Sequence, residues 1–524
     1  MPRHLRNFEP LASLMDLPEE LLLYIFEQSI FPPESLYYMA LLNRRLHFPA
    51  LSVYFSRHGI DLATKSVTIH AKPIAIGWPD SLSALRIYLC LDSLDLQDIT
   101  CVLPHPSCAS TRQIVAHMNR LQCFMSRLSS VKTVKLEFGD DHWELSMCLS
   151  TGTDEALGNW AREFGGLLNC IVTKGCESFT LVNGTYMAQT YDLVLSNSLI
   201  PRWMRRIFPA RAASASNSKF QRSSTQGTIT IRLPAVTQRI QLKSLTVHSA
   251  TLLLPPGLDW TLSALRQSRL TSLALSIPLP RLGNDTIIWQ HILPLVASAA
   301  PHLTSLSIKR VQGEDADIFL AFAARLAYLT TLDLDFHHWS RNFELSKLNR
   351  PMKRLTSLHT IPVVVEHLLA HSALPSIRSI SLIWWMMDDT TFHESFIRPT
   401  LSNLRRLSPL HAACPLHVSL SIVDREISSF ADRTAPYLSA SQDYFPLIQT
   451  IQMHGKYRDL VPLRHMNPLI QFLSLFPCII DLELDTDETF PESDVLELMQ
   501  SLGSHPSLER VLVDGRTYSV AKLP

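Results

Sequence analysis

Apolar and polar residues alternate in a short motif, Leu-x-x-Leu-x-Leu, that recurs along most of the chain. Clear copies, some with Ile or Val in place of Leu, start at positions 242, 270, 303, 329, 377, 448, 479 and 508. Weaker copies occupy 131–136, 176–181 and 415–422. Each copy alternates over its last four positions, which is the pattern of a half-buried strand. The motif therefore predicts a series of short strands with one face in the core.

Segments between the copies show helical spacing instead. Apolar residues recur every three or four positions in 318–326 and in 469–475, as on one face of a helix. Copies that start at 242, 270, 303 and 329 lie 28, 33 and 26 residues apart, so each interval has room for one strand and one helix. The pattern predicts an α/β chain, either a stack of such units or an ordinary doubly wound domain.

The start of the chain carries helical periodicity only. Its apolar residues form one stripe at helical spacing: Leu17, Leu21, Leu22, Ile25 and Phe26. Asp16 and Glu19 have the spacing of a capping box, and Pro18 would occupy the first turn. We expect one amphipathic helix here, which ends at 31–33.

A second helix is expected over 35–47, limited by Pro49. Leu36, Met39 and Ala40 would share its apolar face, and Arg44 with Arg45 would lie near its C-terminal end, where cations are favoured. Two such helices have more apolar surface than they can bury on each other. They form either a docking module or a helical cap on the domain that follows.

Two stretches of this region resemble the F-box. The first is Leu17-Pro18-Glu19-Glu20-Leu21-Leu22, followed by Ile25-Phe26, and the second is Leu36-x-x-Met39-Ala40-Leu41-Leu42-Asn43-Arg44-Arg45-Leu46. F-box proteins are substrate receptors of cullin-type ubiquitin ligases, and the box binds a Skp1-type adaptor. The resemblance implies that apolar side chains hold the adaptor, and through it a cullin: Leu17, Pro18, Leu21, Leu22, Ile25, Leu36, Met39 and Leu42.

The recurring motif is similar to leucine-rich repeats, which commonly accompany an F-box. Its ninth position, normally Asn or Cys, is Ala250, Pro278, Val311, His337 and Trp385 in five copies, so the usual side-chain ladder is not expected. The implied fold is α/β, an N-terminal helical F-box followed by an irregular leucine-rich-repeat-like strand–helix solenoid. The implied domains are a tail (1–10), the F-box (11–60), irregular early repeats (61–205), a Ser-rich flexible loop (206–228) and the solenoid (229–524).

Outward positions of the predicted strands vary while the inward positions stay apolar. A sheet face of this kind suits recognition of a protein target, although a solvated face would look the same. The residues expected to contact a target are Ser305, Ser307, Thr331, Asp333, Asp335, Ser379 and Ser381.

Composition and charge narrow the classes of partner. Equal numbers of basic and acidic residues, 47 each, argue against nucleic acid and against a polybasic membrane contact. The basic stretch 201–206 is better explained as a solvated flank of a loop than as a phosphate-binding patch.

The uncharged stretch 286–308 contains Pro294 and Pro301, so we expect a buried helix, a turn and a strand rather than a membrane span. The chain contains nine Cys without the paired spacing of a disulfide framework, and its start shows no signal-peptide pattern. We therefore expect it in the cytoplasm, the nucleus or both.

No motif of a catalytic, metal or cofactor site occurs in the sequence. His337 and His338 are adjacent on a predicted strand and would point to opposite faces. The acidic run 481–488 is a solvated strand face or an acidic docking edge, and the run 384–387, Trp-Trp-Met-Met, is core packing or a partner patch. We expect a non-catalytic substrate receptor of a Skp1–cullin–F-box ubiquitin ligase. The alternative is a repeat scaffold that recruits no ligase, and an enzyme is a third class.

Overall fold

The structure is a computed structural model of residues 1–524. It describes residues 14–28, 31–71, 79–93, 96–104, 111–139, 154–184, 191–195, 218–222, 233–254, 257–276, 285–338, 345, 350–371, 373–385, 400, 402–404, 416–423, 447–455, 473–474, 476–486, 491–503 and 505–520. The predicted tail (1–10) and most of segments 206–228 and 469–475 lie outside these ranges.

The chain forms two compact units. The first combines Met1–Leu270 with Ser276–Ala300, and the second combines Thr271–Leu275 with Pro301–Pro524. Both units are α/β, with strands that are almost all parallel and follow one another in chain order. The predicted fold class is confirmed at this level.

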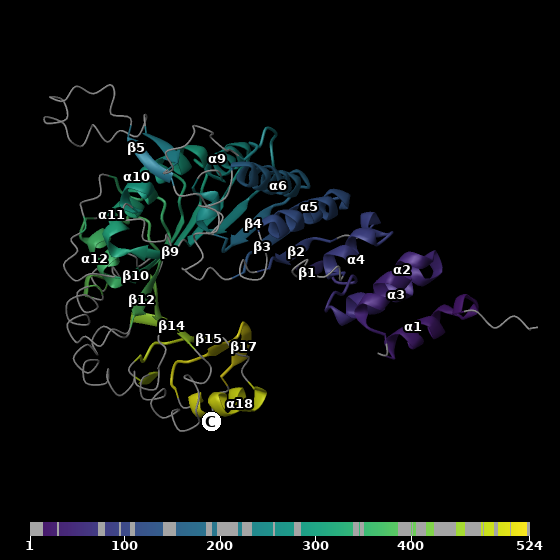
Figure 1. The fold of residues 1–524 in the computed structure, drawn as a ribbon. Coiled ribbons are helices and arrows are strands. Elements are labelled where there is room, and N and C mark those ends of the chain that lie inside the picture. The colour runs from purple at the N-terminus through teal and green to yellow at the C-terminus, as the bar shows by residue number, and fades with distance from the viewer. Residues whose placement is uncertain are drawn as a thin grey trace, which may run out of the picture. The chain divides into compact units, whose positions relative to one another are not determined.

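Three helices open the first unit: α1 (Glu19–Glu27), α2 (Pro33–Leu42) and α3 (Arg44–Arg57). A 3-10 turn at Leu14–Asp16 precedes them. We call residues 14–60 the N-terminal module. Helix α3 packs against both other helices (Figure 1).

The start of α1 differs from the expected capping box. Pro18 is the N-cap residue, and no side chain caps the helix. Asp16 belongs to the preceding 3-10 turn, so its carboxylate does not occupy the capping position. The capping-box prediction was therefore wrong by two positions.

The second predicted helix is in fact two helices. Asn43 has extended backbone dihedral angles, and its side chain accepts a hydrogen bond of 2.8 Å from the Arg45 N–H, so it caps the start of α3. Arg44 and Arg45 consequently begin a helix instead of ending one. Pro49 lies inside α3, although it donates no backbone hydrogen bond. Buried apolar residues on both sides of Pro49 hold α3 in place, which local sequence rules do not capture.

Five parallel strands make the sheet of the first unit: β1 (Ser66–His70), β2 (Asp98–Val102), β3 (Thr133–Glu137), β4 (Ser178–Val182) and β7 (Ser244–His248). Their inward side chains align across the sheet in the row Val67, Ile99, Val134, Phe179 and Leu245. The intervening helices are α4 (Ser81–Ile87), α5 (Thr111–Arg127), α6 (Asp154–Thr173), α9 (Gly257–Gln267) and α10 (Asp285–Ala299). Helices α4 to α6 lie along one face of this sheet (Figure 1). Short 3-10 turns lie at Leu91–Ser93 and Ala250–Leu252.

A separate antiparallel pair joins β5 (Tyr191–Leu195) to β6 (Ser218–Arg222). Strand β6 lies within 206–228, which the composition indicated as a flexible loop. The correction has a physical basis, because the backbone hydrogen bonds of β6 come from a partner strand that local composition does not reveal.

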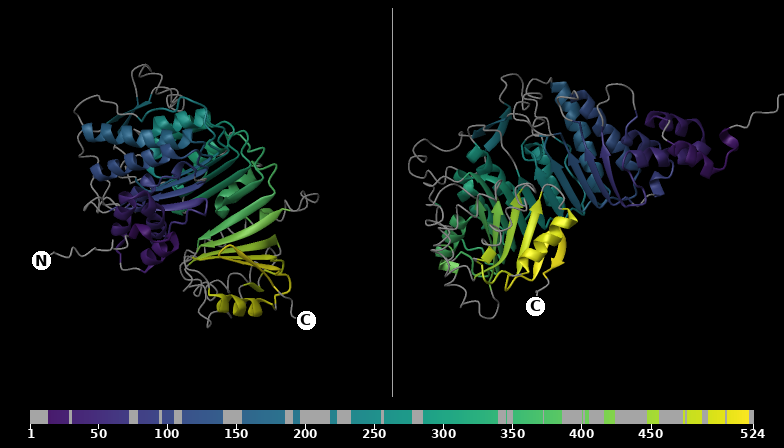
Figure 2. Two further views of the ribbon diagram at one scale, coloured as in Figure 1. Left: turned by 90° about the vertical axis from the view of Figure 1, so that its right-hand side faces the viewer. Right: turned by 90° about the horizontal axis from the view of Figure 1, so that it is seen from below.

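Among the described residues, the second unit contains ten strands that neighbour one another in chain order. Figure 2 shows its green and yellow strands side by side. They are β8 (Ser272–Ser276), β9 (Ser305–Gln312), β10 (Thr331–His338), β11 (Ser357–Thr360), β12 (Ser379–Trp385), β13 (His417–Val423), β14 (Ile448–Gly455), β15 (Asp481–Thr486), β16 (Arg510–Val513) and β17 (Arg516–Ser519). Only β17 pairs antiparallel with its neighbour among the described strands of this sheet. The helices of this unit are α11 (Ala316–Ala323), α12 (Pro362–Ala370) and α18 (Glu492–Leu502), and a 3-10 turn lies at Gly313–Asp315.

Every copy of the Leu-x-x-Leu-x-Leu motif forms a strand. The alternating side chains of each copy point inward, as in the fully buried Leu306 and Leu332. The uncharged stretch 286–308 is α10, a turn and the start of β9, as expected. The search of the sequence missed β1, β2 and β11. Strand β11 follows Leu355-Thr-Ser-Leu358 but has Thr360 where the motif has an apolar residue.

Candidate protein-interaction surfaces

The N-terminal module buries only part of the predicted adaptor surface. Leu22 and Leu36 are 0% exposed, so they are corrections: they form the module's own core and offer no contact to a partner. The half-buried members of the predicted set are Leu17, Ile25 and Met39, and the exposed members are Pro18, Leu21 and Leu42.

Large apolar side chains are concentrated on the outside of this module. Among the described residues ten are exposed, and seven of them lie between positions 14 and 48: Leu14, Leu21, Tyr24, Tyr38, Leu41, Leu42 and Phe48. The other three, Leu89, Tyr328 and Leu496, are scattered singly. Leu21 with Tyr24, and Tyr38 with Leu41 and Leu42, have the three- and four-residue spacing of one helix face. Grouped exposed apolar side chains of this kind mark a protein-interaction surface. We call the seven residues the apolar surface.

Arginine side chains fix the helices that carry the apolar surface. The Arg45 guanidinium donates to the Leu17 carbonyl at 2.7 Å, and Arg57 donates to the Phe26 carbonyl at 2.7 Å and to the Phe31 carbonyl at 2.5 Å. Arg57 thereby satisfies the Phe26 carbonyl in the last turn of α1, where carbonyl groups have no partner within the helix. These bonds join α1 to α3, so α1 has a defined position.

Ring contacts and hydrogen bonds join the module to the first strand–helix unit. His47 Nδ1 donates to the Ala40 carbonyl at 3.0 Å, and its Nε2 accepts from the Leu89 N–H at 3.3 Å. The Tyr88 ring lies 5.8 Å from the Phe55 ring. The Tyr54 hydroxyl donates to the Pro79 carbonyl at 2.9 Å. The module is therefore packed onto α4 and the turn that follows it.

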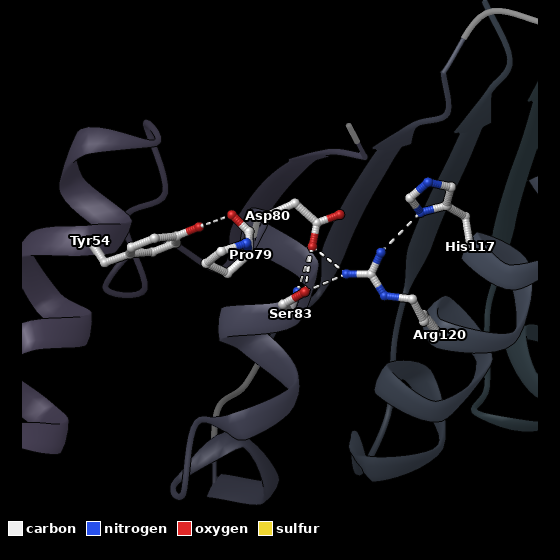
Figure 3. Close-up of polar contacts among 6 residues, drawn as sticks. All are labelled: Tyr54, Pro79, Asp80, Ser83, His117 and Arg120. Carbon is white, nitrogen blue, oxygen red and sulfur yellow. Dashed lines mark hydrogen bonds and ion pairs between the residues drawn. The ribbon is translucent and has the colours of Figure 1, made fainter. Parts of the chain in front are cut away.

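A buried ion pair continues this junction (Figure 3). Asp80 caps α4 by accepting from the Ser83 N–H at 2.9 Å and from the Ser83 hydroxyl at 2.7 Å, and it also pairs with Arg120 of α5. Arg120 in turn donates to His117 Nδ1 at 3.2 Å. Burial alone would raise the pKa of the Asp80 carboxyl, but the hydrogen bond and charge of Arg120, with help from Ser83, hold that pKa below its usual value. No sequence pattern indicated this pair, because Asp80 caps α4 whereas Arg120 belongs to α5.

The predicted target residues lie in register on the outward face of the second unit's sheet. Ser305 pairs with Thr331, and Ser307 pairs with Asp333. The rows continue through β11 to Ser379 and Ser381. Thr331 is exposed and the others, including Asp335, are half-buried. The structure therefore brings the predicted set together on β9, β10 and β12.

Polar side chains on this face bond to one another across strands. The Ser307 hydroxyl donates to Asp333 at 2.7 Å, and His359 Nε2 lies 3.9 Å from the same carboxylate. Further along, Gln452 donates to Glu483 at 2.6 Å, and Arg510 donates to both oxygens of Asp481 at 2.6 and 2.8 Å. The run 481–488 thus begins as a strand whose Leu residues are buried and whose acids face outward, as predicted.

The outward face is not equally open along its length. Ser419 and Ser421 on β13 are 7% and 2% exposed, and Thr450 on β14 is 8% exposed. Polar side chains are therefore least accessible on β13 and at Thr450. The predicted target residues on β9 to β12, and Asp481 and Arg510 on β15 and β16, are half-buried or exposed.

A ladder of threonine hydroxyls joins neighbouring turns in the second unit, and sequence reasoning missed it. Thr304 donates to the Thr271 carbonyl at 3.0 Å, Thr330 to Thr304 at 3.0 Å and Thr356 to Thr330 at 3.1 Å. The signal was present as Leu-Thr at the start of three motif copies, at 270, 303 and 329, and as Leu355-Thr356 before β11. It lies at the end of the strands opposite to the ninth position of the motif, where no side-chain ladder was expected.

Within the described ranges no group of three or more His, Cys, Asp or Glu side chains could hold a metal ion. The helices in those ranges are also too short or too polar to cross a membrane. The side chains of His337, His338, Trp384 and Trp385, and all of Met386 and Met387, lie outside the described part of the chain.

Comparison with known proteins leaves the family open, because no family model matches this chain and no curated protein matches it.

Proposed function

We propose that this chain is a non-catalytic substrate receptor of a Skp1–cullin–F-box ubiquitin ligase. The observation that carries the proposal is the apolar surface, which gathers seven of the ten exposed large apolar side chains of the described residues on one small helical module. That module is the region whose sequence resembles the F-box. In this role α1 to α3 bind a Skp1-type adaptor, and the adaptor recruits a cullin.

In the same proposal the strand–helix units form a leucine-rich-repeat-like solenoid that holds a protein target. The register of outward polar residues across β9 to β12 supports this, because Ser307, Asp333 and His359 present one continuous row. Bonds within the row fix its side chains before a target arrives, which lowers the entropic cost of binding.

The test is a pull-down of the full chain with a Skp1-type adaptor and a cullin. The variant Leu21→Asp with Leu42→Asp places carboxylates at side chains that are 48% and 78% exposed. Burial of an unpaired carboxylate costs about 3 kcal/mol, which predicts a loss of adaptor binding of about a hundredfold.

A matched control is the variant Leu89→Asp with Leu496→Asp, at side chains 48% and 60% exposed outside the module. It should bind adaptor like the unmodified chain. Equal capture by both variants would remove the F-box assignment. Adaptor binding without a cullin would favour the alternative, a repeat scaffold that recruits no ligase.

A further inference from the structure

Positive charge is concentrated at the edge where β10, β11 and β12 begin. Five exposed cations lie in the turns that lead into these strands: Arg325, Arg350, Lys353, Arg354 and Arg378. The turns, residues 324–330, 350–356 and 371–378, contain no Asp or Glu. Because these neighbouring strands are parallel, their starts share one edge of the sheet. We call the five residues the cationic edge.

An exposed aromatic ring lies within the cationic edge. Tyr328 is 43% exposed, and the Arg354 guanidinium carbon lies 4.8 Å from the centre of its ring. The His302 ring, from the turn before β9, lies 5.8 Å from the Tyr328 ring. A cation–π contact of this length holds the Arg354 charge in place at the surface.

The backbone beneath these side chains is fixed by bonds between turns. The threonine ladder joins the turns before β9, β10 and β11. The next turn is joined by the Ser376 hydroxyl, which donates to the Lys353 carbonyl at 2.7 Å, and by the Met352 N–H, which donates to the Ala373 carbonyl at 2.9 Å. The charges are therefore presented from a rigid row, as a preorganised binding surface requires.

Helix dipoles do not account for this cluster. A cation after a helix C-terminus complements the dipole, and Arg325 follows α11 in this way. Arg378 instead lies directly before β12, and Lys353 and Arg354 lie in the turn that leads into β11. Within the described ranges none of the five cations pairs with a carboxylate, so their mutual repulsion has no compensation in that part of the chain.

We propose that the cationic edge binds an acidic, Asp- and Glu-rich segment of a partner protein. Four of the five cations are Arg, whose planar guanidinium matches a carboxylate with two parallel hydrogen bonds. The chain as a whole has no net charge, unlike proteins that bind nucleic acid through their phosphates. This surface is distinct from the outward sheet face and from the apolar surface, so the inference does not depend on adaptor binding.

The experiment measures binding of a fluorescein-labelled oligoglutamate peptide to the full chain by fluorescence anisotropy at about 0.1 M salt. The variant Lys353→Glu with Arg354→Glu should weaken binding about tenfold or more, because it replaces attraction by repulsion at the contact. The control is Lys309→Glu with Arg516→Glu, which changes the net charge equally at two other exposed positions. It should stay within about twofold of the unmodified chain, because neither residue belongs to the turns that precede β10, β11 and β12.

Three results would overturn the proposal: no peptide binding by the unmodified chain, equal loss in both variants, or tighter edge-dependent binding of a single-stranded oligothymidylate of equal charge. The last result would make the edge a phosphate-binding surface for nucleic acid. Circular dichroism melting verifies that each variant is folded. If the charge reversal destabilises the chain, Lys353→Gln with Arg354→Gln takes its place and should still weaken peptide binding while melting normally.

Discussion

Asp80 shows how a single residue joins the N-terminal module to the units that follow. Its side chain is 4% exposed and that of its partner Arg120 is 19% exposed, so the charges are shielded from water. Removal of one member of a buried pair leaves the other charge uncompensated. The adjacent Pro79 carbonyl accepts from Tyr54 of the module, so the pair also positions the residue that the module contacts.

We predict that Asp80→Asn lowers the free energy of unfolding of the first unit by about 3 kcal/mol at neutral pH. Asn can still cap α4, so the change isolates the lost charge. Because the pKa of Asp80 is lowered in the folded chain, its stabilisation is present above the unfolded pKa of about 3.9 and is lost as pH falls through the folded value. The difference in unfolding free energy between the unmodified chain and Asp80→Asn, measured by urea unfolding, should therefore become smaller in acid.

The exposed pair of Arg127 and Asp92, with side chains 33% and 70% exposed, supplies the control. Asp92→Asn should cost less than about 1 kcal/mol, because water screens such pairs. Equal costs for the two substitutions would contradict the buried role of Asp80.

At the scale of elements, the motif predicted strands correctly, because the alternation of apolar and polar residues within each copy is enough to identify a strand. Leu306 and Leu332 are inward by the same rule that identified β9 and β10. The rule failed where tertiary packing decides: Pro49 lies inside α3, and β11 ends on a buried Thr360. Helical spacing predicted surplus apolar side chains on the N-terminal module, but it did not predict that Leu22 and Leu36 are buried while Leu21 and Leu42 are exposed. That outcome depends on how the three helices pack.

The threonine ladder gives a prediction at this scale. Thr330→Val keeps the shape of the side chain but removes its bond to the Thr304 carbonyl, which should destabilise the second unit by about 1 kcal/mol. Thr331→Val, at the neighbouring exposed position, should cost less than half of that. Urea unfolding of the full chain compares the two, and indistinguishable midpoints would mean that the ladder hydroxyls add nothing to stability.

At the scale of the whole molecule, three candidate interaction surfaces lie on one α/β chain. The apolar surface lies on the N-terminal module, the outward polar face lies on β9 to β12, and the cationic edge lies where β10 to β12 begin. The sequence pattern predicted the outward polar face and surplus apolar residues on the N-terminal module, but only Leu21 and Leu42 of the predicted adaptor residues belong to the apolar surface. The cationic edge could not be predicted in this way, since four of its five cations lie between motif copies and all five share one edge only when parallel strands align their starts.

The central claim, that the N-terminal module binds a Skp1-type adaptor, is tested most directly by calorimetric titration of the full chain with purified adaptor. We predict a one-to-one complex with a dissociation constant of about 1 μM or tighter, in keeping with a specific apolar interface. The absence of both binding heat and a comigrating complex in size-exclusion chromatography at about 50 μM of each folded protein, far above that constant, would contradict it.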